Sequence, residues 1–103
     1  MKKAIIALIA AALTLGCSVA AQAEQGVIAL IAGDRMVIQD SMGDYTCAEI
    51  YSGYLYDEGD IIYGDLHTYG VTDWYDDSKD EEITVYIDDC WQTADQAIDY
   101  LRG

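Results

Sequence analysis

The chain contains a single histidine, His67, and a carboxylate two residues before it, Asp65. Positions 65 and 67 of a β-strand lie on one face, so Asp65 could orient the imidazole for acid–base chemistry. One hypothesis is therefore a small hydrolase that uses Asp65 and His67. However, the sequence places no serine or cysteine nucleophile beside them, and one histidine cannot build a zinc site if the cysteines are oxidised. We favour a solvated histidine in a turn, and we predict no catalytic residue.

An acidic stretch extends from Asp73 to Glu82, in which six of ten residues are Asp or Glu. Four of its side chains alternate as the oxygen ligands of a hard cation would: Asp76, Ser78, Asp80 and Glu82. An EF-hand loop also needs glycine at its sixth position, and that position, counted from Asp76, is Glu81. We predict an exposed acidic loop or hairpin tip without a cofactor, and the alternative is a calcium site formed by Asp76, Asp80 and Glu82.

A second acidic cluster is Asp57-Glu58-Gly59-Asp60. Paired carboxylates can carry out glycoside hydrolysis. A chain this rich in acidic residues forms such pairs by chance, and the Gly-Asp sequence is typical of a turn. We interpret this cluster as a turn.

Aromatic residues are the most suggestive feature: the chain has nine tyrosines, two tryptophans and no phenylalanine. Tyrosine and tryptophan supply rigid contact area with a polar handle, which suits a binding face for carbohydrate or peptide. We expect such a face near residues 51–56 and 69–77, with the candidates Tyr51, Tyr54, Tyr56, Tyr69, Trp74 and Tyr75. The alternative is that tyrosine replaces phenylalanine in the core and rim of a small β-protein, because its strand propensity is high.

The N-terminal 23 residues have the pattern of a cleavable export signal. Two lysines precede an apolar run, Ala4 to Leu15, that is shorter than the roughly 20 residues a membrane span needs. Ala21-Gln22-Ala23 then matches a small-x-small cleavage site, which predicts a cut before Glu24. We expect residues 1–23 to be removed, leaving a periplasmic or secreted bacterial protein with no transmembrane segment.

A lipoprotein is the alternative to simple cleavage. Gly16-Cys17 resembles the end of a bacterial lipobox, which has the form Leu-x-Gly-Cys. Thr14 stands three residues before Cys17, so the leucines on either side of Thr14 are out of register. We favour Cys17 as one more small residue of the apolar run.

The expected mature chain, residues 24–103, has the length of one small domain. It holds all 19 acidic residues and three basic ones, and so has a formal net charge of −16 with His67 neutral. Such a field repels nucleic acid and anionic lipid head groups. We therefore expect no nucleic-acid partner, and a cationic or neutral ligand rather than an anionic one.

Two cysteines, Cys47 and Cys90, remain after the expected cleavage. An even pair in a small exported domain predicts a disulfide bond between them. Their separation does not match the Cys-x-x-Cys spacing of a redox pair. Because Cys90 lies just before a predicted helix, this bond would fasten the helix to the third strand.

Turn signals recur at short intervals and separate runs rich in Val, Ile, Tyr and Thr, which is typical of antiparallel β-structure. We predict six strands, near residues 26–31, 35–39, 45–51, 61–66, 71–75 and 83–87. Thr93 and Gln96 form a capping-box pattern that predicts a C-terminal helix packed through Ala94, Ala97, Ile98 and Leu101. The expected fold is mainly β: a small antiparallel barrel of five to six strands with one C-terminal helix.

The segment Gly59-Asp60-Ile61-Ile62-Tyr63-Gly64-Asp65-Leu66 resembles the Gly-Asp-x-[Ile/Val]-x-Gly-x-Leu rhythm of OB-fold and SH3-like barrels. With the preceding hairpins, the resemblance covers about half of the mature chain. It implies a barrel fold and no particular function. We expect a non-catalytic module that binds a glycan, a peptide or a cation. The alternatives are a structural envelope protein with a calcium-binding acidic loop, and the hydrolase based on Asp65 and His67.

Overall fold

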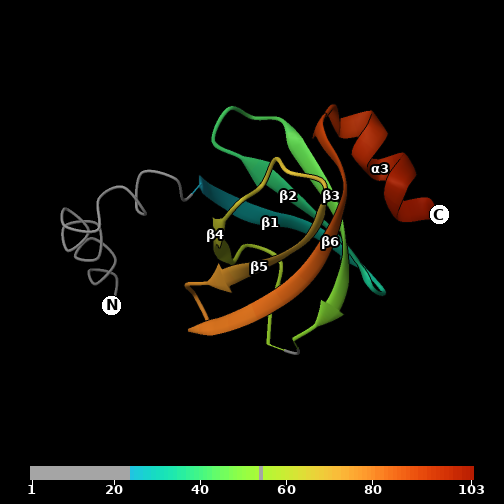
Figure 1. Cartoon of the computed structure of the whole chain (residues 1–103). Helices are drawn as coiled ribbons and strands as arrows, with labels where there is room; N and C mark the ends of the chain where they lie inside the picture. Colours follow the sequence, from blue (N-terminus) through green and yellow to red (C-terminus); the bar gives the residue numbers. More distant parts are fainter. Residues whose placement is uncertain (1–23, 54) are drawn as a thin grey trace.

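The computed structural model describes residues 24–53 and 55–103 (Figure 1). The predicted signal peptide, including Cys17, lies outside these residues, and so does Tyr54. Among the described residues, no helix is both long enough and apolar enough to cross a membrane.

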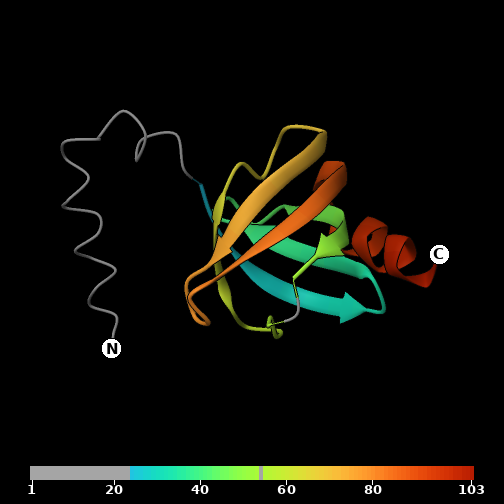
Figure 2. The ribbon, with the colours of Figure 1, turned by 60° about the horizontal axis from the view of Figure 1, so that its bottom comes forward.

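Six strands and one helix follow one another along the chain: β1 (Glu24–Ala32), β2 (Arg35–Asp40), β3 (Tyr45–Ser52), β4 (Ile61–Gly64), β5 (Gly70–Asp76), β6 (Glu81–Gln92) and α3 (Ala94–Arg102). The strands form a closed antiparallel barrel in the order β1-β2-β3-β6-β5-β4, because β4 pairs back with β1. Figures 1 and 2 place α3 outside the barrel. This confirms the predicted mainly-β barrel with a C-terminal helix. Closure also leaves the sheet without an open edge.

Two tight hairpins join the first three strands. Gly33 and Asp34 connect β1 to β2, with Ala32 paired to Arg35 and Gly33 at a φ of 64° that favours glycine. The second turn joins β2 to β3, where the Asp40 backbone N–H donates to the Asp44 carbonyl oxygen at 2.8 Å.

Alternation along the strands builds the core inside the barrel. Ile83, Val85 and Ile87 of β6 are fully buried, as their spacing predicts. They pack with side chains from all the other strands and from the β4–β5 loop: Ile28, Met36, Ile38, Ala48, Ile62, Leu66 and Trp74. A smaller cluster outside the barrel, built on Val37, Cys47 and Ala97, holds α3.

The helix begins as the sequence predicts. The Thr93 side chain accepts a hydrogen bond from the Gln96 backbone N–H, and the Gln96 side chain accepts one from the Thr93 backbone N–H. Its packing face differs slightly from the prediction. Ala97 and Leu101 pack on the sheet with Tyr100, whereas Ala94 and Ile98 are exposed.

The predicted disulfide between Cys47 and Cys90 is wrong, because both are buried free thiols. The β3–β6 register places Cys47 opposite Asp89, and adjacent residues of a strand point to opposite faces. Cys47 therefore packs beneath α3, whereas the Cys90 Sγ lies 3.6 Å from the His67 carbonyl oxygen. Apolar packing, and not a covalent bond, fastens the helix.

The acidic stretch forms a hairpin tip, as one of its two predicted forms, and is corrected in the exposure of Asp76. Residues 73–76 belong to β5 and residues 81–82 to β6, so only the turn of residues 77–80 lies between strands. Trp74 and Asp76 share the inward face of β5 and are both fully buried. The stretch from Asp73 to Glu82 is therefore the tip of the β5–β6 hairpin, one of the two predicted forms, although Asp76 is buried where exposure was predicted.

Candidate functional site

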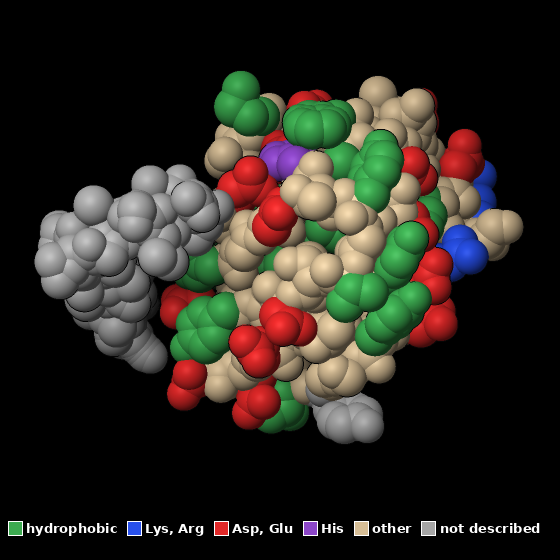
Figure 3. Space-filling model, in the orientation of Figure 1, with side chains coloured by type: hydrophobic (Ala, Val, Ile, Leu, Met, Phe, Trp, Pro, Cys, Tyr) green, Lys and Arg blue, Asp and Glu red, His purple; other side chains and the backbone are tan. Residues whose placement is uncertain are grey.

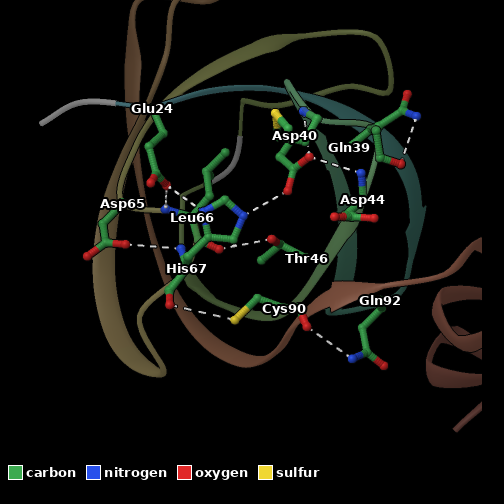
Figure 4. Close-up of polar contacts among 12 residues, drawn as sticks. Glu24, Gln39, Asp40, Asp44, Thr46, Asp65, Leu66, His67, Cys90 and Gln92 are labelled. Carbon is green, nitrogen blue, oxygen red and sulfur yellow. Dashed lines mark hydrogen bonds and ion pairs between the residues drawn. The ribbon is translucent and has the colours of Figure 1, made fainter. Parts of the chain in front are cut away.

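His67 lies at one end of the barrel, in the loop between β4 and β5 (Figure 4). Strand β1 brings its partners there, because Glu24 is opposite Gly64 and Gly26 is opposite Asp40. The first residue of β1 and the last residue of β2 thus meet the β4–β5 loop. We call Glu24, Asp40 and His67 the histidine clamp.

Both imidazole nitrogens of the clamp contact carboxylates: Nδ1 lies 3.0 Å from Glu24 Oε1 and Nε2 lies 2.7 Å from Asp40 Oδ2. Ionised carboxylates only accept hydrogen bonds, so both nitrogens donate when His67 is an imidazolium. Partial burial alone would lower the pKa of His67, but the hydrogen bonds to Asp40 and Glu24 outweigh it and raise the pKa.

The two carboxylates of the clamp differ in their surroundings. The Asp40 side chain is buried and also accepts hydrogen bonds from the backbone N–H groups of Met42 and Asp44, both at 2.9 Å. Burial would raise the pKa of Asp40, but the hydrogen bond from His67 and these backbone bonds lower it overall. Glu24 is more exposed and accepts a second bond from the Leu66 backbone N–H at 2.7 Å.

Trp91 covers the clamp. Its ring stacks on His67 with centroids 4.7 Å apart and planes 9° apart, although the side chain is 60% exposed. Its φ of 55° lies in the left-handed region, which a bulky residue rarely adopts. The stacked imidazole is the neighbour against which the ring of this residue packs.

The clamp links strands and does not resemble a catalytic dyad. Asp65 Oδ1 accepts a hydrogen bond from the His67 backbone N–H at 3.0 Å, while the ring contacts Glu24 and Asp40. Burial raises the pKa of the neighbouring Cys90 thiol, which favours its uncharged form. The arrangement therefore holds an imidazole between two carboxylates, and the thiol beside it within the described residues is not activated.

The aromatic candidates are divided between core and surface. Trp74 is fully buried, with Nε1 donating to the Asp65 carbonyl oxygen at 2.7 Å, and Tyr56 packs against the core. Tyr75 is partly exposed, with its hydroxyl donating to Asp80 Oδ1. Tyr51 and Tyr69 are the most exposed of the described candidates. Trp74 and Tyr56 are thus core residues, whereas Tyr51, Tyr69 and Tyr75 lie at the surface as a binding face would require.

Three exposed side chains form what we call the outer strip, on the face of β3, β5 and β6: Tyr51, Val71 and Tyr86. The rings of Tyr51 and Tyr86 stack with centroids 6.0 Å apart, and Val71 is the cross-strand partner of Tyr86. Figure 3 shows hydrophobic side chains gathered on this face beside acidic ones. The sequence interpretation missed Tyr86, although the alternation of residues 83–87 already turns it outward.

The predicted calcium ligands are not equivalent in the fold. Asp76 is fully buried beside Asp60, whereas Asp80 lies in the β5–β6 turn and Glu82 is exposed on β6. The nearby Lys79 ammonium contacts Asp60 at 2.8 Å and Asp57 at 3.0 Å. Within residues 24–53 and 55–103, no group of three or more His, Cys, Asp or Glu side chains is arranged to hold a metal ion.

Comparisons with known proteins found no match to a protein-family model, to a curated protein or to a solved structure. The functional argument therefore depends on the residues of this chain alone.

Proposed function

We propose that the protein is an exported, non-catalytic binding module that holds a positively charged peptide or protein segment on its outer strip. The observation that carries this proposal is the exposed, stacked pair Tyr51 and Tyr86. Aromatic pairs of this kind provide rigid contact area at the centre of many binding sites. Contiguous exposed apolar side chains with a polar border commonly mark an interaction surface.

Charge supports a cationic partner. Each of the three basic side chains in the described part of the chain is already engaged: Lys79 with Asp57 and Asp60, Arg102 with Asp99, and Arg35 with the Tyr100 carbonyl oxygen. The 19 acidic residues therefore dominate the field around the barrel. Such a field attracts a basic partner and accelerates its association at low ionic strength.

Export supports the same proposal in a different way. The signal-peptide pattern of residues 1–23 predicts a periplasmic or extracellular location for residues 24–103. An acidic module there would encounter cationic segments of other exported proteins and peptides. Neutral glycans are the other ligand class that tyrosine faces accept, and the experiment below includes them.

The test is an NMR titration of ¹⁵N-labelled protein with a basic peptide, with the same peptide carrying Glu in place of Lys and Arg, and with an oligosaccharide. We expect the basic peptide alone to shift the amide signals of residues 49–52, 70–72 and 84–88. Tyr51→Ala with Tyr86→Ala should weaken binding at least about tenfold, because a central aromatic contact contributes about 2 kcal/mol or more.

Ile98→Ala is the matched control, since Ile98 is an exposed apolar residue on α3, away from the strip. This variant should bind the basic peptide as the parent protein does. A titration in which only the oligosaccharide shifts these signals would replace the cationic partner with a glycan. The absence of shifts on this face with every ligand would overturn the proposal.

A further inference from the structure

Two carboxylates border the aromatic pair of the outer strip. Glu49 on β3 is the cross-strand partner of Tyr86 and stands two residues before Tyr51, so it shares their outward face. Asp88 follows Tyr86 by two residues on β6. Strand alternation places the Asp88 carboxylate on the same outward face as Glu49, and the neighbouring Asp88 raises the pKa of Glu49. Two acidic groups thus converge at one end of the aromatic pair.

The basic residue nearest to this pair in the sheet is directed elsewhere. Arg35 is the cross-strand partner of Glu49 on β2, but its guanidinium donates to the Tyr100 carbonyl oxygen and lies 4.8 Å from the centroid of the Tyr100 ring. None of the ion pairs found among the described residues joins Arg35 to Glu49 or to Asp88. The charge of Arg35 lowers the pKa of Glu49 from across the strand pair, but no ion pair among the described residues engages either carboxylate.

Arg35 also shows how this surface accommodates a guanidinium. Its planar group stacks on a tyrosine whose hydroxyl donates to Asp88 at 2.7 Å. The same elements, a tyrosine ring and a nearby carboxylate, recur on the other side of Asp88 with Tyr86 and Tyr51. There the rings are exposed, and no side chain of the described residues stacks on them from outside the pair.

We infer that Tyr51, Tyr86, Glu49 and Asp88 form a binding site for an arginine side chain of the partner. This inference rests on the proposed function and specifies the residue that the outer strip recognises. A guanidinium is planar, so it stacks on aromatic faces while its five N–H donors reach carboxylates in a paired geometry. The apolar stem of the same arginine can lie along Val71.

Arginine fits this site better than lysine does. An ammonium is a compact, strongly hydrated charge that gains less from stacking and cannot contact two carboxylates with a rigid fork of donors. A neutral isostere of arginine keeps the planar shape but loses the attraction to Glu49 and Asp88. Comparing arginine, lysine and the neutral isostere therefore distinguishes the contribution of planar shape to binding from the contribution of charge.

The experiment measures the affinity of three otherwise identical peptides that carry one arginine, one lysine or one citrulline. We expect the parent protein to bind the arginine peptide several-fold more tightly than the lysine peptide and at least about tenfold more tightly than the citrulline peptide, in line with the coupling of close charge pairs at interfaces. Raising the salt concentration should reduce this difference.

Glu49→Gln with Asp88→Asn should abolish the preference for arginine over citrulline. The matched control is Glu81→Gln with Glu82→Gln, which removes the same charge from exposed residues at the other end of β6. It should retain the preference, because the long-range field changes equally in both variants. Asn at 88 keeps an oxygen that accepts the Tyr100 hydroxyl, and Glu49→Gln alone serves if the double variant does not fold.

The possible failures are distinct. If the arginine peptide binds at the outer strip but Glu49→Gln with Asp88→Asn leaves its preference intact, the arginine site is wrong and the binding module stands. If arginine and citrulline peptides bind equally to the parent protein, the arginine site is also wrong. If no peptide binds, the proposed function and the arginine site both fail.

Discussion

At the scale of single residues, His67 carries the clearest polar chemistry in the barrel. Its two nitrogens join Glu24 and Asp40, which are 16 positions apart in the chain, to the loop that follows β4. Its ring also supports Trp91, a bulky residue held at a positive φ. One imidazole side chain thus contacts two strand ends and an exposed tryptophan from its own loop.

Because the folded-state pKa of His67 is raised, its contribution to stability is complete below the ordinary pKa of about 6.5 and is lost as pH rises through the folded-state pKa. We expect His67→Gln to reduce the free energy of unfolding at pH 6 by about 1.5–3 kcal/mol, the usual value of hydrogen bonds to charged groups. The same substitution should cost less at pH 8.5.

Urea unfolding at a series of pH values, followed by circular dichroism, measures this difference. The fluorescence of the two tryptophans gives a second signal, because Trp91 stacks on the titrating ring and Trp74 does not. An equal loss of stability at pH 6 and at pH 8.5 would contradict a protonated clamp.

At the scale of elements, the contact between β4 and β5 is the shortest in the barrel, with two register pairs, Ile62 with Asp76 and Tyr63 with Tyr75. Asp76 closes this contact from inside. Its Oδ1 accepts the Lys79 backbone N–H at 3.0 Å, and its buried Oδ2 has no hydrogen-bond partner in the described structure when the group is ionised. A proton on Asp76 allows it to donate to Asp60, whose charge Lys79 balances.

Burial, followed by the hydrogen bond to Asp60, raises the pKa of Asp76 to about 7. The protonated form is favoured in the folded state, so the contribution of Asp76 to stability is complete below about pH 4 and declines as pH rises to 7. Burial would also raise the pKa of Asp60, but its hydrogen bonds with Asp76, Lys79 and the Asp57 backbone N–H lower it, so its own contribution is present above pH 4.

Asp76→Asn should remove this decline, because an amide donates to Asp60 at every pH. Thermal unfolding between pH 4 and 9 measures this change. Above pH 7 the free energy of unfolding of the variant should exceed that of the parent protein by up to about 3 kcal/mol, the upper cost of a buried polar group without a partner. The pH dependence that Asp76→Asn removes lies mainly between pH 4 and 7, whereas the pH dependence that His67→Gln removes lies above pH 6.5. A variant with the parent's pH profile would show that Asp76 is ionised throughout.

At the scale of the whole molecule, closure of the barrel explains how the six strands are held together although the two buried thiols are not joined. Cys47 lies outside the barrel wall beneath α3, and Cys90 lies at the clamp end. The barrel is closed by backbone pairing around its full circumference, so its stability does not require a covalent cross-link.

We expect both thiols to resist a thiol-reactive reagent in the native protein and to react fully in denaturant, since burial raises the pKa of Cys47 to about 11 and also raises that of Cys90. A reducing agent should leave the midpoint of thermal unfolding unchanged. A lower midpoint under reducing conditions, or the absence of thiols in the denatured protein, would show that Cys47 and Cys90 do form a disulfide.

Much of the fold could be predicted from the sequence because its turns carry strong local signals. Gly33-Asp34, Gly43 and the capping box at Thr93 each act over a few residues, and the strands between them alternate clearly. The exposure predicted for the acidic stretch was wrong at Asp76, because charge was given more weight than alternation. Trp74 faces inward, and the period of two then places Asp76 inward as well.

The candidate site was harder to predict because its contacts are remote in the chain. Glu24 and His67 are 43 positions apart, and only the pairing of β1 with both β2 and β4 brings Asp40 to them. The disulfide failed for a related reason: the β3–β6 register, which contains several shifts, decides which way Cys90 points. Composition alone cannot supply a register.

The position of Glu24 has a practical consequence for producing the protein. This residue begins β1, and its one carboxylate serves both the Leu66 backbone N–H and the imidazole of His67. A recombinant chain that starts at Gln25 would keep nearly all of the strand pairing and still lose one arm of the clamp. The first residue of a recombinant protein therefore decides whether the contact between Glu24 and His67 can form at the end of the barrel beneath Trp91.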